Sequence, residues 1–133
     1  MLKGLFNKKK VANKVLVVED DAMLARVLAE RLKVTKFEVS VVGDGSKVLD
    51  EAVRFLPNII LLDLVLPGID GFTVLKQLKE EAKTKNIPVA VISNLDQASD
   101  IKSVRALGAD QYFLKANTKM DVIVQYVKDK LKQ

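Results

Sequence analysis

Residues 58–63 read Asn58-Ile59-Ile60-Leu61-Leu62-Asp63, and this stretch decides the fold. Four consecutive apolar residues end abruptly at an aspartate, and an apolar run this short, bounded by turn residues, is typical of a strand. Because no polar residue alternates within it, we expect helices to cover both of its faces. The stretch therefore predicts the central strand of a parallel sheet.

Four more strands are predicted on either side of this stretch, and helical segments with apolar residues at helical spacing separate them. The predicted strands are 15–18, 37–42, 58–63, 89–92 and 111–114. Asp44 and Thr118 are predicted to cap helices, and Gly108 to end one. This alternation predicts an α/β fold with a doubly wound, five-stranded parallel sheet flanked by five helices.

Composition restricts the chemistry that is available. The chain has 133 residues, 49% of them hydrophobic and 29% charged, which suits one domain of ordinary size. It contains no cysteine and no histidine, so disulfides, thiolate zinc sites and imidazole chemistry are excluded. Any reaction must use carboxylates, hydroxyls and amines.

The net charge of +5 comes from the N-terminal segment alone. Residues 1–14 contain five lysines and no acid, so the remaining 17 basic residues balance all 17 acidic ones. We therefore predict a basic, flexible tail at 1–13, a domain at 14–133 and no direct binding of nucleic acid. Leu2, Leu5 and Phe6 could contact a membrane surface, but a solvated tail is favoured. Without a membrane span or secretory signal, a cytoplasmic location is expected.

Polar residues gather where the predicted strands end. They are Glu19, Asp20, Asp21, Asp63, Ser93, Asn94 and Lys115. Ligands of open parallel sheets bind at this edge. Converging carboxylates need a cation between them or protons held on them, and oxygen ligands suit Mg²⁺, with Mn²⁺ as an alternative. With Asp63 as nucleophile and Ser93 and Lys115 receiving oxygens, the set suits transfer of a phosphoryl group.

Each of these residues also has a simpler explanation. The acids at 19–21 could only cap a helix, Asp63 could face water at a strand end, and Ser93-Asn94 could be an ordinary turn. Lys115 could be a surface lysine. The combination of all of them at one predicted edge favours a functional site.

Four motifs carry a resemblance to a known family. They are VLVVEDD at 15–21, IILLDLVLPGIDG at 59–71, VISN at 91–94 and GADQYFLK at 108–115. In order and spacing they resemble the receiver domains of two-component response regulators, over residues 14–132. The resemblance implies the flavodoxin-like receiver fold and a single-domain response regulator of the CheY-like kind. Such a protein is not a turnover enzyme.

The resemblance also implies the function and its partners. Asp63 would accept a phosphoryl group, with Mg²⁺, from the phosphohistidine of a sensor histidine kinase or of a phosphotransfer protein. Output would come from a downstream protein partner at the face formed by helices 98–107 and 118–131 and strand 111–114. The implied metal ligands are Glu19, Asp20, Asp63 and the backbone carbonyl of Val65. The implied phosphate and switch residues are Ser93, Lys115 and Tyr112.

Two positions depart from the family pattern. Ala116 follows Lys115 where the family usually has proline after a cis peptide, and a cis bond before alanine costs about 3 kcal/mol. We therefore expect a trans peptide or a strained loop there. Asn94 is larger than the small residue often found after the switch hydroxyl.

Two other functions are compatible with parts of this pattern. A pseudo-receiver that binds partners without phosphorylation is the main alternative. A metal-dependent aspartyl-phosphate hydrolase is disfavoured, because such enzymes usually carry a second acid two residues after the nucleophile, where this chain has Val65.

Overall fold

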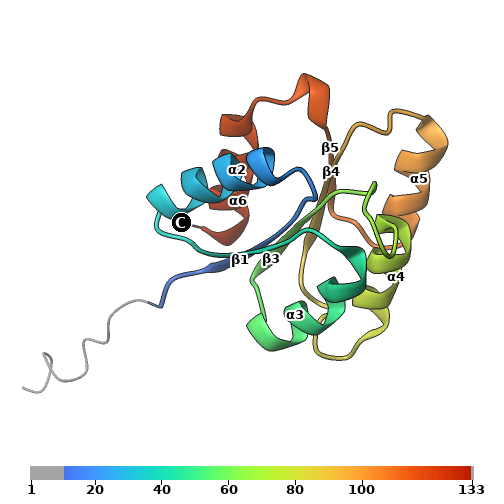
Figure 1. The fold of residues 1–133 in the computed structure, drawn as a ribbon, viewed down its shortest axis with the longest axis horizontal. Coiled ribbons are helices and arrows are strands. Elements are labelled where there is room, and N and C mark those ends of the chain that lie inside the picture. The colour runs from blue at the N-terminus through green and yellow to red at the C-terminus, as the bar shows by residue number, and fades with distance from the viewer. Residues whose placement is uncertain (1–10, 133) are drawn as a thin grey trace, which may run out of the picture.

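Five parallel strands form one sheet in the computed structural model, which describes residues 11–132 (Figure 1). The strands are β1 (Lys14–Val18), β2 (Glu38–Val42), β3 (Ile59–Leu62), β4 (Val89–Ser93) and β5 (Gln111–Leu114). Their order across the sheet is β2-β1-β3-β4-β5, so β3 is central, as predicted. The second strand begins at Glu38 rather than at Phe37, which is buried beside it.

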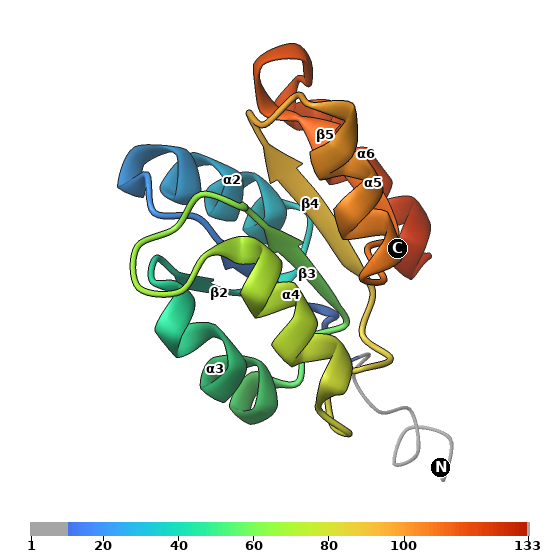
Figure 2. The same cartoon turned by 90° about the vertical axis from the view of Figure 1, so that its right-hand side faces the viewer.

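Helices cover both faces of this sheet, which confirms the doubly wound architecture. The α-helices of the described residues are α2 (Ala22–Val34), α3 (Val48–Phe55), α4 (Gly71–Glu80), α5 (Ala98–Ala106) and α6 (Met120–Leu131). Two short 3₁₀ helices are η1 (Gly45–Lys47) and η2 (Lys115–Asn117). Figures 1 and 2 show α2 and α6 on one face and α3, α4 and α5 on the other.

The core has one apolar cluster on each face of the sheet. Alternate residues of β3 point to opposite faces, so Ile60 and Leu62 join the cluster under α3, α4 and α5. Ile59 and Leu61 join the cluster under α2 and α6. All four side chains are essentially inaccessible to solvent. Their uninterrupted apolar run is thus explained by burial on both faces.

Helix ends agree with the sequence prediction at one position and disagree at two. Gly108, with φ +106°, follows the end of α5. Asp44 accepts a hydrogen bond from the Ser46 N–H at 2.8 Å, so it caps η1, which leads into α3, rather than α3 itself. The prediction that Thr118 caps the last helix is wrong. Its hydroxyl donates to the Leu114 carbonyl at 2.8 Å, because η2 separates β5 from α6.

The loop after β3 is held against the loop after β2. The Gly45 N–H donates to the Pro67 carbonyl at 3.0 Å. Gly68 has φ +80° and lies so close to the Asp44 carboxylate that a side chain at Gly68 would meet it. These contacts define the position of the segment that follows Asp63.

We expect Gly45→Ala to lower the free energy of unfolding by about 2 kcal/mol, because the added Cβ would lie 1.7 Å from the Ile69 carbonyl oxygen. Urea unfolding measures the loss. Gly43→Ala is the control, since the nearest atom to its added Cβ is 3.5 Å away. Equal losses in the two variants would contradict the role of this close contact.

The N-terminal predictions lie mostly outside the described residues. Residues 1–10 include the apolar residues considered for membrane contact, so those expectations stay predictions. Within the described part of the chain, no helix is long and apolar enough to span a membrane.

Candidate functional site

The carboxyl ends of β1 and β3 bring two buried acids together. The Glu19 N–H donates to the Val42 carbonyl at 3.0 Å, and the Asp63 N–H donates to the Val18 carbonyl at 3.0 Å. Each acid therefore continues the hydrogen bonding of its strand by one residue. The two residues are only 7% and 5% exposed. Asp20, the next residue after Glu19, is exposed.

These three acids form the only candidate metal cluster among the described residues. Glu19, Asp20 and Asp63 each offer one carboxylate oxygen, and these oxygens all lie within 4.8 Å of one another. Such an arrangement is electrostatically unfavourable without a positive charge nearby. The distances between these oxygens agree with the prediction that the acids meet at the edge of the sheet.

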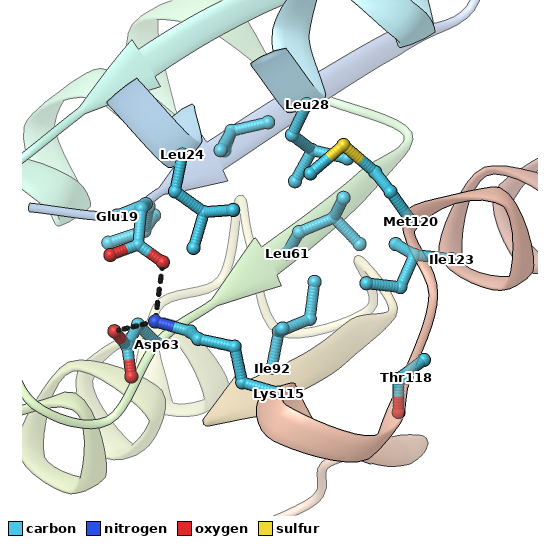
Figure 3. A pocket seen from close by; sticks show the side chains of 12 residues that line it. Glu19, Leu24, Leu28, Leu61, Asp63, Ile92, Lys115, Thr118, Met120 and Ile123 are labelled. Atoms are coloured by element: carbon cyan, nitrogen blue, oxygen red, sulfur yellow. Dashed lines mark hydrogen bonds and ion pairs between the residues drawn. The ribbon is translucent and has the colours of Figure 1, made fainter. Parts of the chain in front are cut away.

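Lys115 supplies a positive charge at this site (Figure 3). Its Nζ lies 2.7 Å from Glu19 Oε1 and 2.8 Å from Asp63 Oδ2. One ammonium thus bridges two carboxylates that come from different strands. The sequence placed Lys115 at this edge but did not reveal its pairing with Glu19, which is 96 residues away.

Burial and hydrogen bonding set the charge states of this pair. Burial raises the pKa of Glu19, and the hydrogen bonds from Lys115 and from the Asp21 backbone only partly oppose it. Burial also disfavours the charged form of Lys115, but its hydrogen bonds to Asp63 and Glu19 outweigh this and raise its pKa. The ammonium is therefore held in its charged form against the carboxylates.

Backbone donors orient the two buried carboxylates. The Asp21 N–H donates to Glu19 Oε2 at 3.1 Å, and the Val65 N–H donates to Asp63 Oδ1 at 3.2 Å. Each donor lies two residues after its acceptor, which is the pattern of an Asx-type turn. These bonds leave the other oxygen of each carboxylate, Glu19 Oε1 and Asp63 Oδ2, to Lys115. No pattern in the sequence indicated these two backbone bonds.

Ser93 and Tyr112 are connected through the loop that follows β4. Ser93 is fully buried, and its hydroxyl accepts a hydrogen bond from the Leu95 N–H at 3.3 Å. The Tyr112 hydroxyl donates to the Leu95 carbonyl. Burial raises the pKa of Tyr112, so this hydroxyl stays protonated and can donate. The aromatic ring is thus tied to the loop that carries Ser93.

The Lys115–Ala116 peptide is trans, since no cis peptide bond occurs in the described residues. This is one of the two outcomes expected from the missing proline. The following residues form η2, and Thr118 closes that turn on the Leu114 carbonyl. The loop thereby delivers Lys115 to the acids without a proline.

The donor set fits Mg²⁺. All three clustered side chains offer carboxylate oxygen, which is the ligand type that hard divalent cations prefer. Softer metal ions prefer imidazole or thiolate ligands, and the sequence contains no histidine and no cysteine.

A family model gives this fold and site a class. The model for the response regulator receiver domain matches residues 15–128, so the chain belongs to the receiver domains of two-component response regulators. Receiver domains act in phosphorylation-based signalling, bind Mg²⁺ in an acidic pocket and are not turnover enzymes.

Individual relatives agree with this assignment. Response regulator PleD of Caulobacter vibrioides is 41% identical over 102 residues, which cover 77% of this chain and 22% of PleD. The BeF₃-activated N-terminal receiver domain of Klebsiella pneumoniae RstA is 29% identical with a TM-score of 0.82, over 91% of this chain and 100% of that domain. The chain spans less than half the length of the curated relatives it matches.

A third structure of the same fold contains a metal ion. It is the receiver domain of a Pseudomonas aeruginosa sensor histidine kinase, with a magnesium ion coordinated in its active site cleft. It shares 20% identity and a TM-score of 0.81 with this chain, over 92% of this chain and 100% of that domain. This likeness shows the common fold.

Proposed function

We propose that this chain accepts a phosphoryl group on Asp63 from the phosphohistidine of a sensor histidine kinase or of a phosphotransfer protein, and then binds a protein partner. The observation that carries the proposal is the buried Asp63 carboxylate beside Glu19, with Lys115 Nζ 2.8 Å from its Oδ2. A nucleophilic carboxylate, a second acid and a fixed ammonium are the groups that phosphoryl transfer needs.

In the proposed reaction, an Asp63 oxygen forms a bond to phosphorus while the phosphorus–nitrogen bond of the donor breaks. The electron pair of that bond stays on the imidazole nitrogen, which takes up a proton. Lys115 is close enough to Asp63 to pair with the oxygens of the transferred group, and the Ser93 hydroxyl is the second candidate. The family usually has a proline after this lysine, but the ammonium reaches Asp63 without one.

Residues of this chain would hold Mg²⁺ at the acidic cluster. We assign Asp20 and Asp63 as direct ligands, Glu19 as a partner through water and the backbone carbonyl of Val65 as a further ligand. The bound ion would neutralise charge that develops on the phosphoryl oxygens. The cluster of three carboxylate oxygens within 4.8 Å of one another supports this assignment.

The test uses a small phosphodonor and the purified chain. We expect intact mass spectrometry to show one added phosphoryl group when Mg²⁺ is present and none in excess chelator. A chain that stays unlabelled by the donor and also shows no response to beryllofluoride would instead support the pseudo-receiver alternative.

We propose that Ser93 transmits the phosphorylation signal to the partner face formed by α5, β5 and α6. We expect Ser93→Ala to be phosphorylated but to switch poorly, because the hydroxyl can no longer bond to phosphate and draw in the loop that holds Tyr112 through Leu95. Hydrogen exchange of α5, with and without phosphorylation, measures the response. The same phosphorylation-dependent protection in wild type and Ser93→Ala would contradict this role.

The lifetime of the phosphoryl group is expected to be long. Val65 and Leu95 lie two residues after Asp63 and Ser93, and neither side chain can orient an attacking water by hydrogen bonding. We expect Val65→Asn, alone or with Leu95→Glu, to speed dephosphorylation about tenfold, or about 1.4 kcal/mol of barrier. Val34→Asn, an exposed valine on α2, is the control. Wild-type decay as fast as that of the double variant would show the idea to be mistaken.

A further inference from the structure

A cavity of about 60 Å³ lies between α2 and α6, beside the acidic site. Most of its wall is apolar, and polar side chains complete it. The apolar part includes Leu24, Leu28, Leu61, Ile92, Met120 and Ile123, and the polar part is Glu19, Asp63, Lys115 and Thr118. Figure 3 shows the apolar side chains pointing toward a common space. We refer to this space as the α2–α6 cavity.

Lys115 joins this cavity to the acidic site. Its aliphatic stem forms part of the wall, while its Nζ holds Glu19 and Asp63 at 2.7 and 2.8 Å. Figure 3 shows the stem running beside Ile92 toward Asp63. A molecule in the cavity would therefore lie beside the side chain that pairs with both carboxylates.

The walls determine which chemistry the cavity accepts. The apolar side chains offer no strong hydrogen-bond donor or acceptor, so a water molecule beside them would lose its partners, whereas an apolar solute would not. The polar side chains of the lining are already hydrogen-bonded to other groups of the chain. A cavity of about 150 Å³ holds benzene or xenon. At about 60 Å³, this cavity suits an uncharged ligand smaller than benzene.

We propose that the α2–α6 cavity binds small uncharged apolar molecules, and that an occupied cavity holds Lys115 against Glu19 and Asp63. The ligand contacts the stem of Lys115 in its present position, and a divalent cation competes with the ammonium for the same carboxylates. The two ligands therefore oppose each other, by the same factor in both directions. The first half of the proposal is the binding of an apolar ligand in the cavity, and the second half is its opposition to cation binding. The second half rests on the cation site of the proposed function.

Xenon is the probe for the first half. We expect saturable methyl shifts in NMR spectra under xenon pressure for Leu24, Leu28 and Leu61. Leu75 and Leu78 are internal controls, because they are buried in the cluster on the opposite face of the sheet. Absence of saturable shifts at the cavity, or equal shifts in both clusters, would overturn the proposal.

Filling the cavity tests the location. Leu24→Phe adds volume to the wall and is expected to abolish the saturable shifts while the chain stays folded. Met120→Phe does the same from α6 if the first variant fails to fold. Persistence of the shifts in either folded variant would overturn the location, and the comparison of the two wild-type clusters decides the question if neither folds.

Calorimetric titration with Mg²⁺ tests the second half. We expect xenon to raise the apparent Kd for Mg²⁺ about fivefold, at the low end of coupling between two sites. An unchanged Kd would overturn the link between cavity and Lys115. If Mg²⁺ fails to bind at any xenon pressure, the cation site is refuted instead, and the methyl shifts alone decide whether the cavity takes a ligand.

Discussion

Asp63→Asn is expected to abolish phosphorylation by a small phosphodonor, with the rate falling by more than about a thousandfold, as when a nucleophile is removed from an enzyme. An amide oxygen is a far weaker nucleophile than a carboxylate. The Asp63 carboxylate is held in place by hydrogen bonds from Lys115 and from the Val65 backbone. Intact mass spectrometry over time measures the rate.

The matched control for this variant is Asp50→Asn. Asp50 lies exposed on α3, away from the acidic cluster, so it is expected to be labelled at the wild-type rate. Chelator should stop labelling in wild type and control alike. Label that persists in Asp63→Asn, or that forms equally well in excess chelator, would show that the phosphoacceptor has been assigned to the wrong residue.

Lys115→Met is expected to have opposite effects on two measurements. Labelling should slow about a hundredfold, because one fixed donor to the transferred group is lost. Mg²⁺ should nevertheless bind more tightly, since the ammonium that pairs with Glu19 and Asp63 no longer competes for them. Mass spectrometry follows the first effect and calorimetric titration the second.

The opposite signs of these two effects distinguish a chemical role of Lys115 from a structural one. Loss of stability alone would weaken both Mg²⁺ binding and labelling, whereas the proposed role moves them in opposite directions. Lys83→Met removes an exposed lysine in the segment before β4 and is expected to change neither. Weaker Mg²⁺ binding in Lys115→Met would refute competition between the ammonium and the cation.

Local sequence patterns were enough to predict the sheet. The run at Ile59–Leu62 is apolar throughout because both faces of β3 are covered, so its burial is encoded in consecutive residues. Parallel strands present their carboxyl ends at one edge of the sheet. This rule alone predicted that Glu19, Asp63 and Lys115 lie close together. Their roles in phosphoryl transfer remain predictions.

Helix ends were less predictable, because they depend on short competing hydrogen bonds. Thr118 is a good cap by residue type, but its hydroxyl bonds back to the Leu114 carbonyl. Asp44 does cap a helix, but a 3₁₀ helix precedes the α-helix there. In both cases a 3₁₀ helix of three residues lies before the α-helix. The side chain therefore bonds to the backbone at that 3₁₀ helix and not to the first turn of the α-helix.

The sequence by itself determined the central strand of the sheet, the class of fold and the residue types at the carboxyl edge of the sheet. These follow from the periodicity of apolar residues and from the rule that parallel strands end at one edge. Only the tertiary structure decided that Lys115 bridges Glu19 and Asp63, that Gly45 touches Ile69, and that apolar side chains of α2 and α6 enclose a cavity. Each of these contacts joins residues far apart in the chain. Its geometry depends on side-chain packing between elements, for which no local pattern exists.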